Sequence, residues 1–198
     1  MITQNQYTTI DEIFDYYNVK LFDGKLKDCM IITSRKKDAA GYFQYKAWKN
    51  KAVKKDADIH EICLNPDFFN NDDMQWQKTL VHIMVHIYQY DHGKPSRRDY
   101  HNLEWAEIME KIGLMPSSKG KPGGERTGFK MSEYPVPGGM FIEAYNSLKD
   151  KNIKYIFSSK AEENDGKPSN SKESYTCPAC GTKMWGKKNI LAMCVVCM

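Results

Sequence analysis

The segment Thr79-Leu-Val-His82-Ile83-Met-Val-His86 decides how the rest of this chain is interpreted. Residues four apart lie on one face of a helix, so the imidazoles of His82 and His86 can reach a single metal ion. A third histidine, His101, follows after a further fourteen residues. In the zincin pattern the residue after the first histidine is a glutamate that serves as general base. Here that residue is Ile83, so the sequence predicts a metal-binding site that lacks the usual carboxylate.

The residues around the histidine pair predict a long, mostly buried helix that begins at Asp72 or Asp73 and ends near Tyr90. Its apolar stripe consists of Trp76, Leu80, Ile83, Met84 and Ile87. Since Ile83 lies in the middle of this stripe, we expect the substitution to leave the fold intact. A pair of hydrogen-bonded core histidines is the alternative to a metal site. The third histidine favours zinc, which accepts three imidazoles and leaves a fourth position for water.

The N-terminal third of the chain predicts a helix and a small sheet. Apolar residues at helical spacing predict a helix over residues 8–22, with Thr8 or Thr9 as the N-cap. Residues 29–33, 41–48 and 59–64 read as three strands, with the Lys-rich segment 49–58 as a hairpin loop. We therefore expect a small antiparallel sheet packed on helices.

After the histidine helix, the sequence predicts a polar loop and then a helix from His101 to about Ile112. Residues 113–139 contain seven glycines and four prolines, so they are expected to form an extended loop without regular structure. Residues 140–157 are expected to add a short helix or strand. Together these elements predict an α+β, zincin-like domain over residues 1–157.

The C-terminal cysteines predict a second metal site. Cys177 and Cys180 form one CxxC pair, Cys194 and Cys197 another, and thirteen residues separate the pairs. This spacing is typical of a structural zinc ribbon, here expected over residues 175–198 and folded only with metal bound. Gly181 fits the knuckle turn, and Trp185 and Ile190 are candidates for a minimal core. The polar segment 158–174 is expected to be a flexible linker. The two remaining cysteines, Cys29 and Cys63, lie in apolar runs and are expected to be buried side chains that fill space in the core.

Composition and charge set broad limits on location and partners. The 198 residues are 41% hydrophobic, with no apolar run of the roughly 20 residues that a membrane span needs. The N-terminus lacks the pattern of a secretory signal, so we expect a cytoplasmic protein. The net charge of +4 is compatible with nucleic-acid contact without requiring it.

Basic residues cluster in two places, and the sequence leaves their role open between solvated loops and contacts with an anionic partner. The clusters consist of Lys46, Lys49, Lys51, Lys54 and Lys55, and of Lys94, Arg97 and Arg98. The remaining histidines, His60 and His92, are expected to lie on the surface or to support a metal ligand.

Taken together, these features resemble the SprT-like family of zinc metallopeptidases, a zincin family that includes the DNA-dependent protease Spartan. The resemblance extends over nearly the whole chain. Besides the histidines and the ribbon, it rests on Phe14-Asp-Tyr-Tyr-Asn18, Leu21-Phe-Asp-Gly-Lys-Leu26, Gly41-Tyr-Phe43, Glu61-Ile-Cys-Leu-Asn-Pro66, Gly93-Lys-Pro-Ser-Arg-Arg98, Tyr100-His-Asn-Leu-Glu-Trp105 and Gly113-Leu-Met-Pro-Ser-Ser118.

The resemblance implies a metalloprotease fold that acts on proteins bound to DNA. It implies His82, His86 and His101 as zinc ligands and the ribbon as the usual appendage, hence two zinc ions. We further expect Tyr175 and Trp185 to stack on bases of single-stranded or distorted DNA.

Ile83 departs from the family pattern and leaves two functions open. One is a peptidase that is catalytically impaired, and the other is a non-catalytic module that binds DNA or a protein partner through the cleft and the ribbon. A residue introduced into an active enzyme to trap a complex is a third explanation for Ile83. Glu104, three residues after His101, is a weak candidate for a substitute base, and orienting His101 or capping its helix is the favoured role for it.

Overall fold

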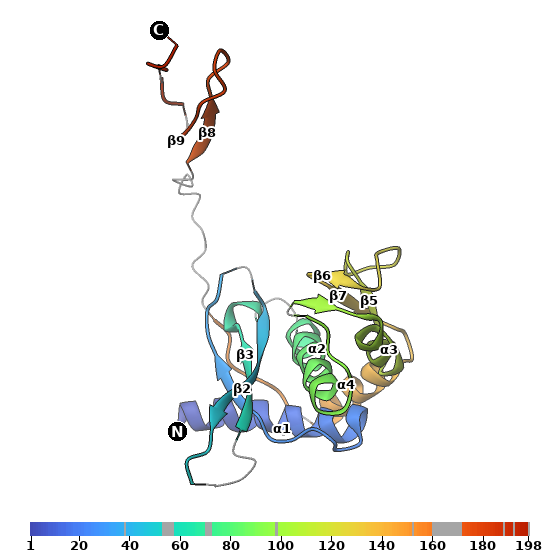
Figure 1. Cartoon of the computed structure of the whole chain (residues 1–198). Coiled ribbons are helices and arrows are strands. Elements are labelled where there is room, and N and C mark those ends of the chain that lie inside the picture. The colour runs from blue at the N-terminus through green and yellow to red at the C-terminus, as the bar shows by residue number, and fades with distance from the viewer. Residues whose placement is uncertain are drawn as a thin grey trace. The chain divides into compact units, whose positions relative to one another are not determined.

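The helix that carries two of the histidines lies between a three-stranded sheet and a second layer of helices and short strands (Figure 1). The structure is a computed structural model that describes residues 1–37, 39–52, 58–69, 73–97, 99–151, 153–159, 172–187, 189–191 and 193–197. The chain divides into two units, Met1–Lys160 and Ala161–Met198. Among the described residues, we find no helical segment with the length and apolar character of a transmembrane span.

The described elements follow one another in alternating runs of helix and strand. In the first unit they are α1 (Ile2–Phe22), β1 (Met30–Thr33), β2 (Gly41–Lys49), β3 (Asp58–Leu64), the short 3₁₀ helix η1 (Pro66–Phe68), α2 (Asp73–His92), β4 (Tyr100–His101), α3 (Leu103–Lys111), β5 (Leu114–Ser117), β6 (Gly128–Phe129), β7 (Ser132–Pro135) and α4 (Met140–Asp150). In the second unit, β8 (Glu173–Thr176) pairs with β9 (Lys183–Gly186) in antiparallel fashion. The α+β class predicted from the sequence is confirmed.

The three predicted strands form one sheet in the order β1-β3-β2, but this sheet is mixed rather than antiparallel. Strand β2 pairs with β3 in antiparallel fashion, whereas β1 runs parallel to β3. The alternation of side chains is the same in both kinds of pairing, so the sequence pattern could not distinguish them. Of the predicted hairpin loop, residues 53–57 lie outside the described part of the chain.

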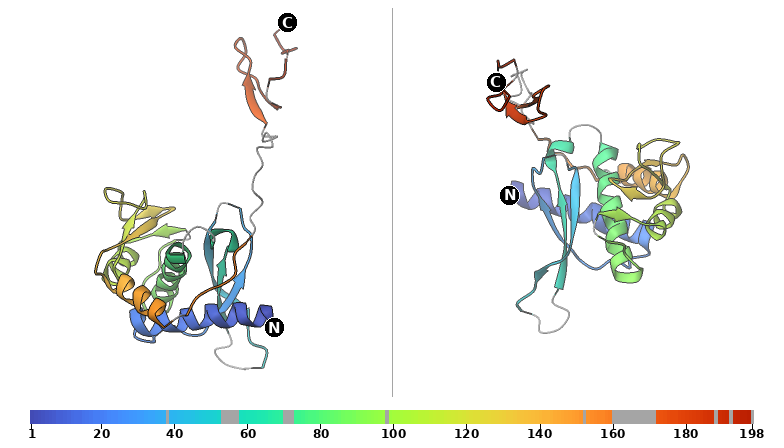
Figure 2. Two further views of the ribbon diagram at one scale, coloured as in Figure 1. Left: turned by 180° about the vertical axis from the view of Figure 1, so that it is seen from behind. Right: turned by 45° about the horizontal axis from the view of Figure 1, so that its top comes forward.

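Helix α2 is the centre of the hydrophobic core. It contacts β2 and β3 on one side and α3 on the other, while α1 crosses beneath α2 and the sheet (Figures 1 and 2). The stripe predicted from the sequence is confirmed, because Trp76, Leu80, Ile83, Met84 and Ile87 are all buried. The helix continues two residues beyond the predicted end. The alternative cap Asp72 lies outside the described residues, and Asp73 is the first residue of the helix.

Helix α1 starts six residues earlier than predicted. It begins at Ile2 with Met1 as the N-cap residue, so neither Thr8 nor Thr9 caps it. The Thr9 hydroxyl donates instead to the carbonyl of Asn5, a bond made within a continuing helix. The polar first turns of this helix carry no apolar periodicity, and the sequence pattern therefore missed them.

The segment after α2 is more regular than predicted. His101 does not open a helix, because it lies in β4, and α3 begins at Leu103 with the Asn102 side chain accepting from the Trp105 N–H at 3.0 Å. Residues 113–139 contain three strands that form two-stranded pairs, β4 with β6 and β5 with β7. Proline is tolerated in these strands because each has only one partner. Composition alone therefore gave the wrong prediction for this segment.

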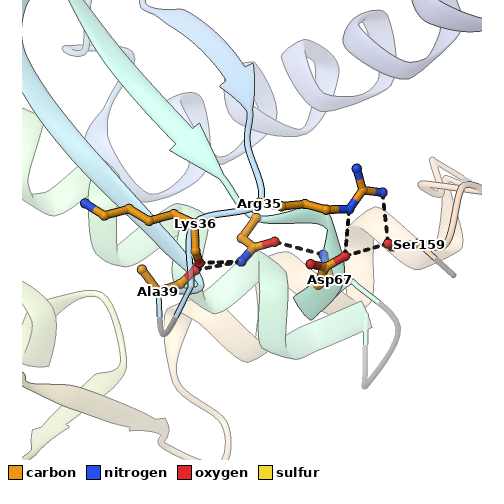
Figure 3. A network of polar contacts seen from close by, with 6 residues as sticks. Arg35, Lys36, Ala39, Asp67 and Ser159 are labelled. Carbon is orange, nitrogen blue, oxygen red and sulfur yellow. Dashed lines mark hydrogen bonds and ion pairs between the residues drawn. The ribbon is translucent and has the colours of Figure 1, made fainter. Parts of the chain in front are cut away.

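Residues 153–159 return the chain to the sheet end of the first unit. Ser159 donates to Asp67 Oδ1 at 2.6 Å and accepts from Arg35 Nη2 at 3.1 Å, and Arg35 also pairs with Asp67 (Figure 3). The predicted linker thus begins inside the first unit, and β8 starts before its predicted end. Its middle, residues 160–171, lies outside the described part of the chain.

Gly113 lies between α3 and β5 and packs beside the start of α4, so it offers a direct test of this packing. Its φ is +83°, and a Cβ atom there would lie 2.8 Å from the backbone nitrogen of Met140. Gly123 has a φ of +85° with nothing within 4 Å, so it is a matched control for the cost of the backbone conformation. We expect Gly123→Ala to lower the free energy of unfolding by roughly 1–2 kcal/mol. Gly113→Ala should cost clearly more in urea denaturation, and equal losses would contradict the described packing.

Candidate metal centre

Three histidine nitrogens converge on one point in the first unit. The Nε2 atoms of His82 and His86 each lie 3.1 Å from Nε2 of His101. Ligands bound tetrahedrally at 2.0–2.1 Å from zinc lie about 3.3–3.4 Å apart. The separation of the three nitrogens is therefore close to what a shared ion requires, and the donor set fits zinc.

Two different elements bring these ligands together. Helix α2 presents His82 and His86 from successive turns, and β4 supplies His101 after the loop that follows the helix. The fully buried ring of Trp105 packs against all three imidazoles, with centroid distances of 5.0, 5.8 and 4.3 Å. On the sheet side, the ring of Phe43 stacks parallel to that of His86. Aromatic rings thus hold the histidines within an apolar enclosure.

Two of the ligands are also held through their second ring nitrogen. His82 Nδ1 lies 2.7 Å from Oε2 of Glu133, and His101 Nδ1 lies 3.2 Å from the carbonyl oxygen of Gly128. An acceptor at Nδ1 keeps the proton there and leaves the Nε2 lone pair free for a metal. Both partners come from the segment predicted to be an irregular loop. No local pattern around Glu133 indicated that it would reach His82.

The pKa values of two histidines favour the ligand form. Burial, followed by the neighbouring histidines, holds the pKa of His86 well below its usual value. Burial and then His82 lower the pKa of His101 to about 4. Both rings are therefore neutral at neutral pH, as metal binding requires.

Ile83 fills its position without a polar group. It is 3% exposed and lies against strand β2, where a Cβ atom on Gly41 would come within 2.9 Å of its Cδ1. This agrees with the expectation that the aliphatic side chain packs without disturbing the fold.

Glu104 is engaged away from the histidine nitrogens. Its Oε2 accepts from the Lys94 backbone N–H and from Gln89 Nε2, both at 2.7 Å. The capping role that was one expectation for Glu104 belongs instead to Asn102, which also accepts from Gln89 at 2.8 Å. These groups fix the loop that precedes His101, so Glu104 supports the site through the backbone.

The other two histidines lie outside the group of three. His60 is buried, so the expectation that it lies on the surface is wrong. Its Nε2 lies 3.1 Å from Oδ1 of Asp91, and its Nδ1 accepts from the Lys46 N–H. His92 is exposed, as expected, and contacts the carbonyl of Lys25. Of the single cysteines, Cys63 is buried as predicted and Cys29 only partly so.

The four ribbon cysteines form the second group that could hold a metal. Sulfur separations are 3.3 Å for Cys177 and Cys197, 3.6 Å for Cys180 and Cys194, and 3.5 Å for Cys194 and Cys197. Tetrahedral Zn–S bonds of about 2.3 Å place sulfurs roughly 3.8 Å apart, so the set fits one ion.

Hydrogen bonds within the ribbon favour the thiolate form of two of these cysteines. Backbone N–H groups, first that of Cys180, lower the pKa of Cys177, and the Thr182 hydroxyl leads the effects that lower the pKa of Cys180 to about 6.

Around these cysteines, the predicted turn is confirmed and the predicted core only in part. Gly181 has a φ of +72°, as the turn requires. Ile190 packs on Gly186, whereas Trp185 is 67% exposed and does not form a core.

The predicted basic residues lie on exposed surface wherever they are described. Lys46, Lys49 and Lys51 are in β2 and the turn after it, and Lys46 pairs with Asp58 at 3.4 Å. Lys94 is exposed, and the Arg97 guanidinium lies over the rings of Tyr100 and Phe129. Lys54, Lys55 and Arg98 lie outside the described residues.

Comparison with known proteins assigns the part of the chain that carries the histidines. The sequence model of the SprT-like family matches residues 10–125, more than half of the chain. No curated protein and no solved structure matches the chain. All three histidines lie within the matched residues, whereas Gly128, Glu133 and the ribbon lie beyond them. The chain belongs to the SprT-like family.

Proposed function

We propose that this chain is a zinc metallopeptidase-type protein that acts on proteins associated with DNA, and that Ile83 impairs its catalysis. The observation that carries the proposal is the convergence of three histidine Nε2 atoms within the part of the chain that matches the family. Three imidazole nitrogens are a donor set expected of a catalytic zinc site, in which the fourth position is kept for water.

In this proposal His82, His86 and His101 hold one zinc ion and the four ribbon cysteines hold a second. Bound zinc would lower the pKa of a coordinated water toward about 7. The rings of Trp105 and Phe43 pack against the histidines, and the Nδ1 partners keep His82 and His101 oriented. The ribbon ion is enclosed by four sulfurs and has a structural role.

The consequence of Ile83 follows from its chemistry. A general base contributes roughly 10²–10⁴-fold to such a reaction, and an alkyl side chain cannot accept a proton at any pH. Two nearby carboxylates are already engaged, Glu133 at the far nitrogen of His82 and Glu104 at Gln89 and Lys94. We therefore propose slow hydrolysis at most in the unaltered chain.

The lost base also supports a second candidate, a module that binds without cleaving. A cleft can keep its shape after losing turnover, and the packing of Ile83 against β2 is compatible with this. Peptidase activity of altered proteins separates the two candidates, as described below.

The proposed contact with DNA is supported by exposed cations next to exposed rings. On β2, Tyr45 and Trp48 are 46% and 45% exposed and alternate with Lys46 and Lys49. The ribbon adds the exposed Trp185. Aromatic faces and lysines together suit single-stranded nucleic acid, whose bases stack and whose phosphates attract cations.

We expect two zinc ions per chain by elemental analysis after dialysis against metal-free buffer. His101→Ala should leave close to one, because two imidazoles and water hold zinc far less tightly than three. His92→Ala is the matched control, since this exposed histidine lies outside the site, and it should retain two. Full zinc content in His101→Ala, or disulfides between the CxxC pairs, would contradict the assignment.

Restoring the carboxylate tests the proposed catalytic role. Ile83→Glu should raise cleavage of a DNA-bound protein by roughly 10²–10⁴-fold. Ile83→Gln, of the same shape but without a base, should stay at the level of the unaltered chain. Burial of the new group should cost at most a few kcal/mol of stability, since the zinc charge favours its ionised form.

Two other outcomes of this experiment have distinct meanings. Inactivity of Ile83→Glu with zinc bound would favour the binding module. Equal activity of the unaltered chain and Ile83→Glu would show that another group serves as base, with Glu104→Gln as the first variant to examine.

DNA binding should weaken with salt, and two kinds of variant should affect it differently. For single-stranded DNA the slope of log K against log salt is roughly −0.7 per phosphate contact. Replacing Lys49 and Lys51 by Gln removes two phosphate contacts and should make this slope shallower by about 1.4 units. Trp185→Ala should weaken binding by about 1–3 kcal/mol with the slope unchanged. An affinity that is the same at low and moderate salt would refute the proposed contact.

A further inference from the structure

Glu133 is a buried carboxylate that neither the sequence motifs nor the family match assigns. It lies in β7, eight residues beyond the end of the matched region, and its side chain is 7% exposed. A carboxylate is rarely buried to this extent unless it is paired. Its Oε2 lies 2.7 Å from Nδ1 of His82.

The backbone around Glu133 is fixed to the same helix that carries His82. In the β5–β7 pair, Glu133 lies opposite Pro116. Its main-chain carbonyl accepts from Nζ of Lys78 at 3.3 Å, and Lys78 lies one turn before His82 on α2. Lys78 is itself buried. Its hydrogen bond to the Glu133 carbonyl and the contact between Glu133 and His82 together set the position of β7 against α2, and they hold the carboxylate toward the His82 ring.

The position of the carboxylate on the ring distinguishes two possible roles. Nδ1 and Nε2 are on opposite sides of an imidazole, and it is Nε2 of His82 that faces the other two histidines. A group at Nδ1 is therefore separated by the ring from a water bound at the metal position. It cannot replace the base missing at residue 83, but it can fix which nitrogen carries the proton and how the ring is turned.

We infer that Glu133 is a positioning residue of the metal centre, which holds His82 in the tautomer and orientation that ligate zinc. The backbone carbonyl of Gly128 has the same relation to His101. The centre is thus completed by residues 128–133, outside the part of the chain that the family match covers. This inference rests on the proposed zinc site but not on peptidase activity.

Zinc affinity in the full-length chain, measured by competition with a chromophoric chelator, tests the inference. Glu133→Ala should weaken binding of the histidine-site ion by roughly 10- to 100-fold. Glu133→Gln keeps a neutral acceptor for Nδ1–H, and it should lose less but at least about threefold, because charged acceptors bind more strongly. The ribbon ion, in the same molecule, should be unchanged in both. Glu143→Gln, which removes an exposed carboxylate from α4, is the control.

The outcomes separate this inference from the proposed function. No zinc at the histidine site of the unaltered chain would overturn both. Zinc binding there with affinity unchanged in Glu133→Gln, or in a Glu133→Ala that remains folded by circular dichroism, would overturn the inference alone. Equal weakening of both ions would indicate a general loss of structure and would also overturn it. If Glu133→Ala does not fold, the isosteric Gln variant decides the question.

Discussion

The structure of the first unit depends on one constraint: three imidazoles from two elements must meet beside aromatic rings, with the outer nitrogens of His82 and His101 each directed at an acceptor. Buried polar atoms without partners are costly, so the surrounding elements are arranged to supply them. Glu133 and the Gly128 carbonyl serve the outer nitrogens of His82 and His101, and the Trp105 ring packs against all three imidazoles. The short strands β4, β6 and β7 matter because they deliver His101 and these two acceptors.

The packing around this site also explains why the chain tolerates Ile83. The residue lies on the stripe of α2 that packs against the sheet, next to Gly41, where an aliphatic side chain satisfies the packing as a carboxylate could not without the metal. In the proposed function, metal binding depends on the three histidines and not on residue 83. A group of three histidines that could hold a metal, beside an alkyl side chain at residue 83, follows from the sequence and the packing together.

The sequence predicted those parts of the site that depend on local periodicity. The helix with His82 and His86, the strand segments, and the two CxxC pairs were all evident from spacing, and the family match bears out the resemblance. What it could not predict depends on contacts between distant segments. Tertiary packing sets the parallel pairing of β1, the place of His101 in a strand and the approach of Glu133 to His82. Patterns within a single sequence do not reveal such packing. The strands in residues 113–139 were not predicted because glycines and prolines are frequent there. Short strands with a single partner tolerate both residue types.

The central claim is that the three histidines form a metal centre that is intact despite Ile83. A crystal structure of the zinc-loaded chain, with anomalous differences measured at the zinc edge, tests it most directly. The account predicts one anomalous peak about 2.0–2.1 Å from Nε2 of His82, His86 and His101, with Glu133 still bonded to Nδ1 of His82. Clear density for the three rings without an anomalous peak between them, in a crystal whose ribbon site holds zinc, would contradict it.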